Sequence, residues 1–114
     1  MISRSTLFLL PAGFEDGGKR QFCPECAEIW GYLTYFPEVK VALDIRYEKL
    51  AHPRDEPVAL LGAGKWNCPT LVLADDAPDA QSVEIKTVNG KRYLDNARDI
   101  ERYCAEIFGT PAPR

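Results

Sequence analysis

The sequence has 114 residues, 46% of them hydrophobic, so it can bury one core but is too short for two ordinary domains. Its net charge is −3 and its basic residues are scattered, which argues against a nucleic-acid partner. No signal peptide is evident, and no apolar run approaches the ~20 residues needed to cross a membrane. We therefore expect a cytoplasmic protein with no membrane partner.

The first third of the chain predicts a strand, a loop and a helix. Residues 6–10 form a short apolar run that suits a buried strand. Residues 14–21 are polar and glycine-rich and predict a mobile loop. A helix is expected from Cys23 until Pro37 stops it. Its predicted apolar stripe consists of Cys26, Ile29, Trp30, Leu33 and Phe36.

The middle of the chain predicts two strands separated by a short helix. Residues 39–47 alternate between apolar and polar side chains, which is typical of a strand. Residues 55–61 predict the short helix, which the glycines at 62 and 64 end. A run of apolar and β-branched residues at 70–73 predicts a further strand.

The end of the chain predicts a hairpin and a last helix. Residues 83–88 and 91–94 flank Asn89-Gly90, the pair that a type I′ turn prefers. Asp95 or Asn96 is expected to cap a helix that ends at Gly109. Residues 1–109 thus form one predicted domain, and residues 110–114 a disordered tail. The apolar face of the last helix is Ala97, Ile100, Tyr103, Cys104, Ile107 and Phe108.

Cys23 and Cys26 carry the candidate chemistry. Their CxxC spacing is shared by redox sites and by half-sites for zinc, so the spacing alone leaves both open. Cys23 lies at the predicted helix start, where backbone N–H groups and the helix dipole favour a thiolate. Paired cysteines in the cytoplasm are more often catalytic or metal-binding than structural. Glu25 adds a negative charge near this thiolate, which predicts a reducing couple.

The order of these elements, with the run Cys68-Pro69-Thr-Leu-Val-Leu after the CxxC, resembles the thioredoxin superfamily. The resemblance covers nearly the whole chain and implies an α/β fold of order βαβαββα, with a central mixed four-stranded sheet flanked by helices. Pro24 makes the motif similar to the CPxC glutaredoxins, whereas Phe22 stands where thioredoxins have Trp. The chain also resembles an uncharacterised family of small proteobacterial thioredoxin-like proteins.

The resemblance implies a thiol–disulfide oxidoreductase that acts on protein or small-molecule disulfides without a cofactor. Cys23 would be the nucleophile and Cys26 the resolving thiol. Pro69 would be cis and lie beside the CxxC pair, so that Cys68 and Pro69 would contact the substrate. The nearest counterparts of the residues that hold glutathione in glutaredoxins, Asp95 and Asn96, are about one residue out of register, which argues against glutathione as a partner.

Two alternatives concern the third thiol. Cys68 could act as a second resolving thiol or only fill space before Pro69. In another class of function, the protein would be a non-catalytic module that binds zinc or an iron–sulfur cluster through Cys23, Cys26 and Cys68. A fourth ligand is hard to find: Cys104 lies on the predicted buried stripe, and His52 is expected at the surface.

Overall fold

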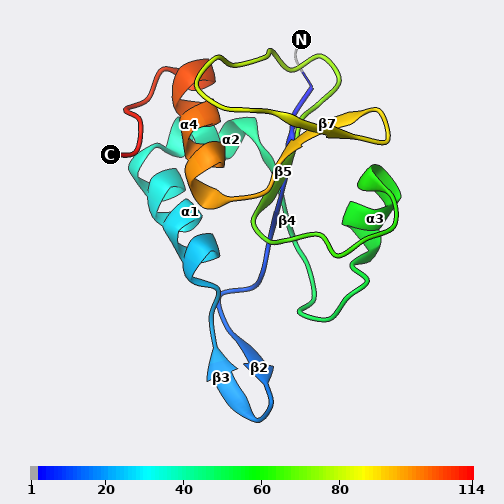
Figure 1. The fold of residues 1–114 in the computed structure, drawn as a ribbon. Coiled ribbons are helices and arrows are strands. Elements are labelled where there is room, and N and C mark those ends of the chain that lie inside the picture. Colours follow the sequence, from blue (N-terminus) through cyan, green and yellow to red (C-terminus); the bar gives the residue numbers. More distant parts are fainter. Residues whose placement is uncertain (1–2) are drawn as a thin grey trace.

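The computed structural model, which describes residues 3–114, contains a mixed five-stranded sheet in the order β4-β1-β5-β7-β6 (Figure 1). Strand β1 is parallel to β4 and antiparallel to β5, and the pairs β5–β7 and β7–β6 are antiparallel. The α/β class is confirmed. The sheet has five strands where the resemblance implied four, because β6, the first strand of the predicted hairpin, extends its edge. The strands are β1 Thr6–Leu9, β4 Asp44–Tyr47, β5 Thr70–Val72, β6 Lys86–Val88 and β7 Lys91–Leu94.

Helices cover both faces of this sheet. Helices α1 (Pro24–Tyr35) and α4 (Ala97–Phe108) pack together on one side, and the short α3 (Asp55–Leu61) lies on the other (Figure 1). Helix α2 (Pro37–Ala42) follows α1 directly. Within residues 3–114, no helix is both long and apolar enough to cross a membrane.

Elements with strong local signals lie where the sequence predicted them. Helix α3 covers the predicted 55–61. Asn89 and Gly90 have φ angles of 51° and 73°, as a primed hairpin turn requires, and join β6 to β7. The Asn96 side chain accepts a hydrogen bond from the Asp99 N–H and so caps α4, which ends at Gly109 in the left-handed region.

The strand predicted over 39–47 was wrong in its first half. Residues 37–42 form α2, with Pro37 in its first turn, and only residues 44–47 form a strand. Val39 and Leu43 are buried, whereas Val41 is 68% exposed. Buried residues four apart fit a helical turn as well as every second position of a strand, so the apolar alternation was ambiguous here.

The loop predicted over 14–21 is a β-hairpin, which projects from the body next to the start of α1 (Figure 1). Strands β2 (Phe14–Asp16) and β3 (Lys19–Gln21) pair in antiparallel fashion and place acidic residues opposite basic ones. Gly17 and Gly18 have φ angles of 59° and 78° and make the turn. Apolar alternation could not reveal this hairpin because its pairing is mainly between charged residues.

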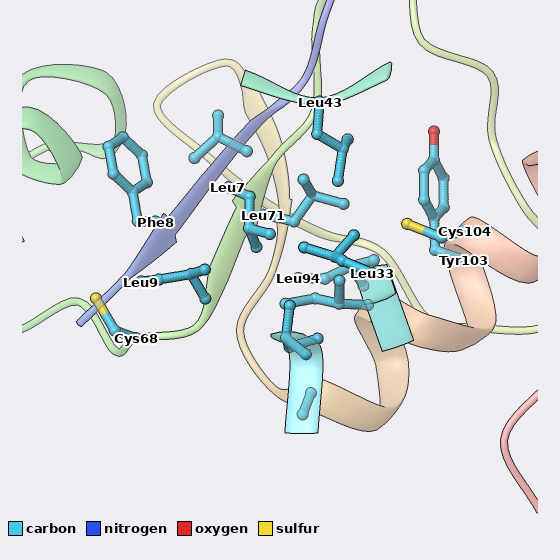
Figure 2. Close-up of a cluster of buried hydrophobic side chains, with 14 of the residues drawn as sticks. Leu7, Phe8, Leu9, Leu33, Leu43, Cys68, Leu71, Leu94, Tyr103 and Cys104 are labelled. Carbon is cyan, nitrogen blue, oxygen red and sulfur yellow. The ribbon is translucent and has the colours of Figure 1, made fainter. Parts of the chain in front are cut away.

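The core covers both faces of the sheet: one part lies between the sheet and the pair α1–α4, and Phe8 points to the other side, towards α3 (Figure 2). Leu7 and Leu9 of β1, Leu71 of β5 and Leu94 of β7 are almost completely buried there. After α4, residues 110–114 contain no helix or strand, and the Thr110 hydroxyl forms a 2.6 Å hydrogen bond with the Tyr32 hydroxyl of α1. The chain end thus returns towards α1.

Candidate active site

Cys23 caps the N-terminus of α1 with its sulfur. The Cys26 N–H donates to Cys23 Sγ at 3.1 Å, and Pro24 occupies the first helical position, where a missing N–H costs nothing. The side chain is half-buried and packs against the core at its edge. The Cys23 sulfur therefore lies at the positive end of α1 and accepts one of its free backbone N–H groups.

Cys26 lies one turn further on and faces the core. It is buried, and the N–H of Leu10, just after β1, donates to its sulfur at 3.4 Å. Burial raises the pKa of the Cys26 thiol to about 12, and the neighbouring Cys23 adds to this rise. Cys26 is therefore a protonated thiol at neutral pH, and the two cysteines differ in exposure as the sequence predicted.

The chain before β5 brings Cys68 and Pro69 to the CxxC pair. The Cys68–Pro69 peptide bond is cis, and the Cys68 carbonyl oxygen lies 3.7 Å from Cys23 Sγ. The structure therefore brings together three of the residues that the sequence singled out, although 45 positions separate Cys23 from Cys68. A second cis bond, His52–Pro53, lies in the loop before α3.

The Cys68 side chain is buried in the core behind this carbonyl (Figure 2). Burial raises the pKa of its thiol to about 11, which the positive charge of Arg54 partly opposes. Arg54 is itself only 5% exposed. Its guanidinium donates to the carbonyls of Lys49, Leu50 and Trp66 at 2.8 to 3.0 Å, so it fixes the two loops on either side of α3.

An apolar pocket of about 250 Å³ opens beside the two thiols. Phe22 forms one side of it and is 60% exposed, and Trp30 forms another. Trp30 also stacks on Tyr47 of β4 with 6.4 Å between ring centroids. The sequence placed Trp30 on the apolar stripe of the helix, and it marked Phe22 only as the residue that stands where thioredoxins have Trp. The positions of Phe22 one before Cys23 and of Trp30 four after Cys26 were the only signal of a role here. The remaining lining residues are Leu10, Pro11, Ala12, Cys23, Cys26 and Ala27.

The family model described as "Protein of unknown function (DUF3088)" matches residues 4–112. The chain belongs to this family. No curated protein and no solved structure matches the chain. The family match thus covers the thiol pair, the cis-proline and all helices, and leaves the assignment of function to the chemistry of the site.

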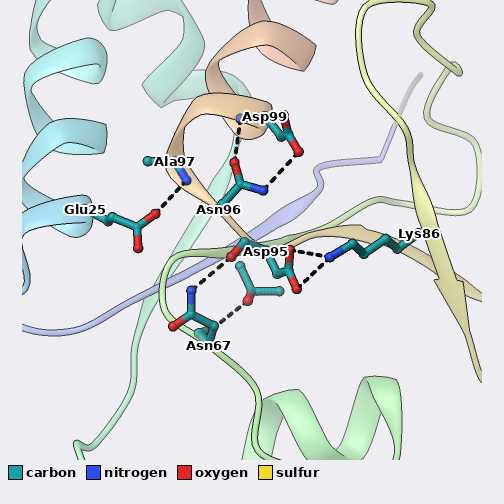
Figure 3. Close-up of polar contacts among 8 residues, drawn as sticks. Glu25, Asn67, Lys86, Asp95, Asn96, Ala97 and Asp99 are labelled. Carbon is teal, nitrogen blue, oxygen red and sulfur yellow. Dashed lines mark hydrogen bonds and ion pairs between the residues drawn. The ribbon is translucent and has the colours of Figure 1, made fainter.

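The start of α4 is occupied by side chains of the protein itself (Figure 3). Glu25 turns away from the thiols, and its carboxylate accepts the Ala97 N–H at 3.2 Å. Asp95 pairs with Lys86 at 2.9 Å, and its carbonyl accepts a hydrogen bond from the Asn67 amide. The sequence expected the Glu25 charge near the thiolate, and its bond to α4 was not foreseen because 72 positions separate the two residues.

The other candidate ligands lie apart from this site. Cys104 is buried in the core on α4, as predicted, and burial raises its pKa to about 12. His52 is exposed in its loop. Among the residues that the structure describes, no group of three or more histidine, cysteine, aspartate or glutamate side chains is arranged to hold a metal ion, the three thiols included.

Proposed function

We propose that the protein is a thiol–disulfide oxidoreductase of thioredoxin-like fold, with Cys23 as nucleophile and Cys26 as resolving thiol. The observation that carries this proposal is the Cys23 sulfur, half-exposed at the start of α1, with the Cys26 N–H donating to it and the carbonyl before cis-Pro69 beside it. The strand order β4-β1-β5-β7, with only β1–β4 parallel, supports the fold assignment.

The reaction transfers two electrons from the dithiol to a disulfide. The Cys23 thiolate attacks one sulfur of the substrate, which breaks the substrate S–S bond, forms a mixed disulfide and releases the other sulfur as a thiolate. Cys26 then loses its proton to this released thiolate and attacks Cys23 Sγ. The mixed disulfide breaks, the second substrate sulfur leaves as a thiolate that takes a proton from water, and Cys23–Cys26 becomes a disulfide. A small thiol or a reduced dithiol protein must restore the dithiol.

The buried position of Cys26 suits its role in the second step. Its high pKa arises first from burial and then from the presence of Cys23. When Cys23 is part of a mixed disulfide it carries no negative charge, and ionisation of Cys26 is then opposed by burial and, to a smaller extent, by Cys68. The resolving thiol therefore becomes easier to activate at the stage at which it is needed.

The substrates are protein or low-molecular-weight disulfides. The apolar pocket beside the thiols would accept an apolar side chain next to the substrate sulfur, and the backbone at Cys68 and Pro69 would contact the rest of the substrate. We place the protein in the cytoplasm, where such dithiols are kept reduced.

A stoichiometric oxidation tests the proposal without knowledge of the natural reductant. The protein is reduced with dithiothreitol, desalted and mixed with insulin, and free thiols are then counted by maleimide labelling and mass spectrometry. We expect wild-type protein to lose two thiols, with an internal Cys23–Cys26 disulfide in the peptide map. Cys23→Ser should lose none and leave insulin intact.

Cys104→Ala is the matched control because it removes a buried thiol far from the α1 start. It should oxidise like the wild type. Equal insulin reduction by Cys23→Ser, or no internal disulfide in the wild type, would contradict the proposal.

A further inference from the structure

A second pocket, of about 570 Å³, lies along α1 beyond the thiol end. Its volume is typical of sites for small ligands. Its walls come from α1, from α4 and from the chain end, which the hydrogen bond from Thr110 to Tyr32 holds against α1. The pocket lies away from the two thiols, because neither Cys23 nor Cys26 lines it. Its lining combines aromatic residues and prolines with two acids: Tyr32, Tyr35, Phe36, Pro111 and Pro113, with Glu28 and Glu101.

Two carboxyl groups meet in this pocket. Glu101 of α4 is only 4% exposed, and its Oε2 has no hydrogen-bond donor among residues 3–114. Its neighbour is the carboxyl of Glu28 on α1, which also pairs with Arg98 Nε at 2.9 Å. Two carboxylates in contact repel unless a proton or a cation lies between them. Burial and the Glu28 carboxyl raise the pKa of Glu101 to about 8, which favours the protonated form of Glu101 at neutral pH.

Gly31 leaves space in the same pocket. It lies in the middle of α1, where glycine costs about 0.5–1 kcal/mol relative to alanine. No unusual backbone angle calls for a glycine here, and a Cβ at this position would meet no atom within 4 Å. The residue therefore has no backbone or packing role, and its effect is to keep the pocket open beside Glu28 and Glu101.

We propose that this pocket binds a small organic ammonium ion with an apolar body, whose N–H groups are held by the carboxyl groups of Glu28 and Glu101 that line it. The ammonium would donate to the carboxyl groups of Glu28 and Glu101, and the carboxylates would balance its charge. The aromatic side chains of Tyr32, Tyr35 and Phe36 attract a cation through their faces and pack against the apolar body. The pocket thus matches an amine better than an acid or a neutral ligand.

The charges around Glu101 predict that binding releases a proton. Arg98 and Arg102 of α4 favour its ionised form, and Glu28 of α1 opposes it. From α1 and α2, Tyr32 and Glu38 also face this region, and burial raises the pKa of Tyr32 to about 12, so that it stays neutral. Below pH 8, entry of an ammonium ion therefore costs the Glu101 proton, and affinity should rise with pH.

Phenethylamine is a suitable probe, with phenethyl alcohol as its neutral match. Titration into the isotopically labelled protein should give saturable amide shifts around Glu28, Gly31 and Glu101, with a Kd of about 0.1–1 mM. Calorimetry at pH 7 in buffers of different ionisation enthalpy should show close to one proton released per ligand. Phenethyl alcohol should bind at least about tenfold more weakly.

Three variants separate this site from a purely structural acid pair. Glu101→Gln keeps the shape but should lose the proton release and about tenfold in affinity. Gly31→Leu should fill the pocket and abolish binding with the fold intact. Cys23→Ser should bind phenethylamine like the wild type, so the result does not depend on the thiol chemistry. Absence of saturable shifts at about 10 mM, equal binding of the alcohol, or unchanged binding by Glu101→Gln would overturn the proposal.

Discussion

Two places along α1 each hold a buried acidic group beside a more exposed one. At its start these are the thiols of Cys26 and Cys23, and further on they are the carboxyls of Glu101, which comes from α4, and Glu28. Burial is the main cause of the raised pKa in both, at about 12 for Cys26 and about 8 for Glu101. The thiol stays neutral over the whole physiological range, so reactivity at that end depends on its half-exposed partner Cys23. The carboxyl titrates within that range, so the other end responds to pH and to cations. The same burial would thus serve the proposed thiol chemistry at one place and the proposed ligand binding at the other.

The largest expected effect is on the thiol end, from Cys26→Ser. Without a resolving thiol, the reaction should stop at the mixed disulfide, and multiple-turnover insulin reduction with dithiothreitol should fall by about 100-fold or more. Non-reducing mass spectrometry should show the covalent adduct on Cys23. If turnover persists and a Cys23–Cys68 disulfide forms, Cys68 is the resolving thiol and the assignment of Cys26 is wrong.

Arg54→Ala should destabilise the loops on either side of α3, next to Cys68 at the thiol site. Loss of the buried guanidinium leaves three carbonyl groups without their donor, so we expect the free energy of unfolding to fall by about 3 kcal/mol. Urea denaturation measures this. Arg46→Ala is the matched control, because Arg46 also makes three hydrogen bonds but is exposed, and its loss should lower the stability much less. Equal losses of stability in the two variants would mean that the buried hydrogen bonds of Arg54 contribute no more than the exposed ones of Arg46.

Glu101→Gln tests the carboxyl pair, because the stability of the variant should depend on pH differently from that of the wild type. The folded-state pKa of about 8 lies above the ordinary 4.5, so the unfolded chain ionises first and wild-type stability falls as pH rises from 4.5 to 8. Glutamine does not ionise. The variant should therefore be more stable than the wild type by about 1–3 kcal/mol at pH 9 and similar at pH 4. A gain that is independent of pH would contradict this account.

Gly31→Ala has the smallest expected effect. Its Cβ meets open space, so the higher helix propensity of alanine should raise the free energy of unfolding by about 0.5–1 kcal/mol. Thermal unfolding followed by circular dichroism measures the change. Thiol oxidation should be unaffected. A destabilised Gly31→Ala would show that the pocket side of α1 is already packed.

The sequence by itself determined the elements that short-range signals specify. Asn89-Gly90 predicted its hairpin because both residues accept positive φ angles, and Asn96 and Gly109 predicted the bounds of α4 by capping it. The difference between Cys23 and Cys26 also followed from sequence, since one lies at a helix start and the other on its apolar stripe. These signals act over a few residues, and so they can be read locally.

Only the tertiary structure decided which distant groups meet. The Leu10 N–H reaches Cys26, Glu25 reaches the start of α4, and Glu28 meets Glu101, all across long separations in sequence. The hairpin over 14–21 and helix α2 depended on strand pairing and packing that the periodicity of apolar residues in the sequence does not reveal. Burial sets the pKa values of Cys26 and Glu101, and burial is a property of the whole fold rather than of any one segment.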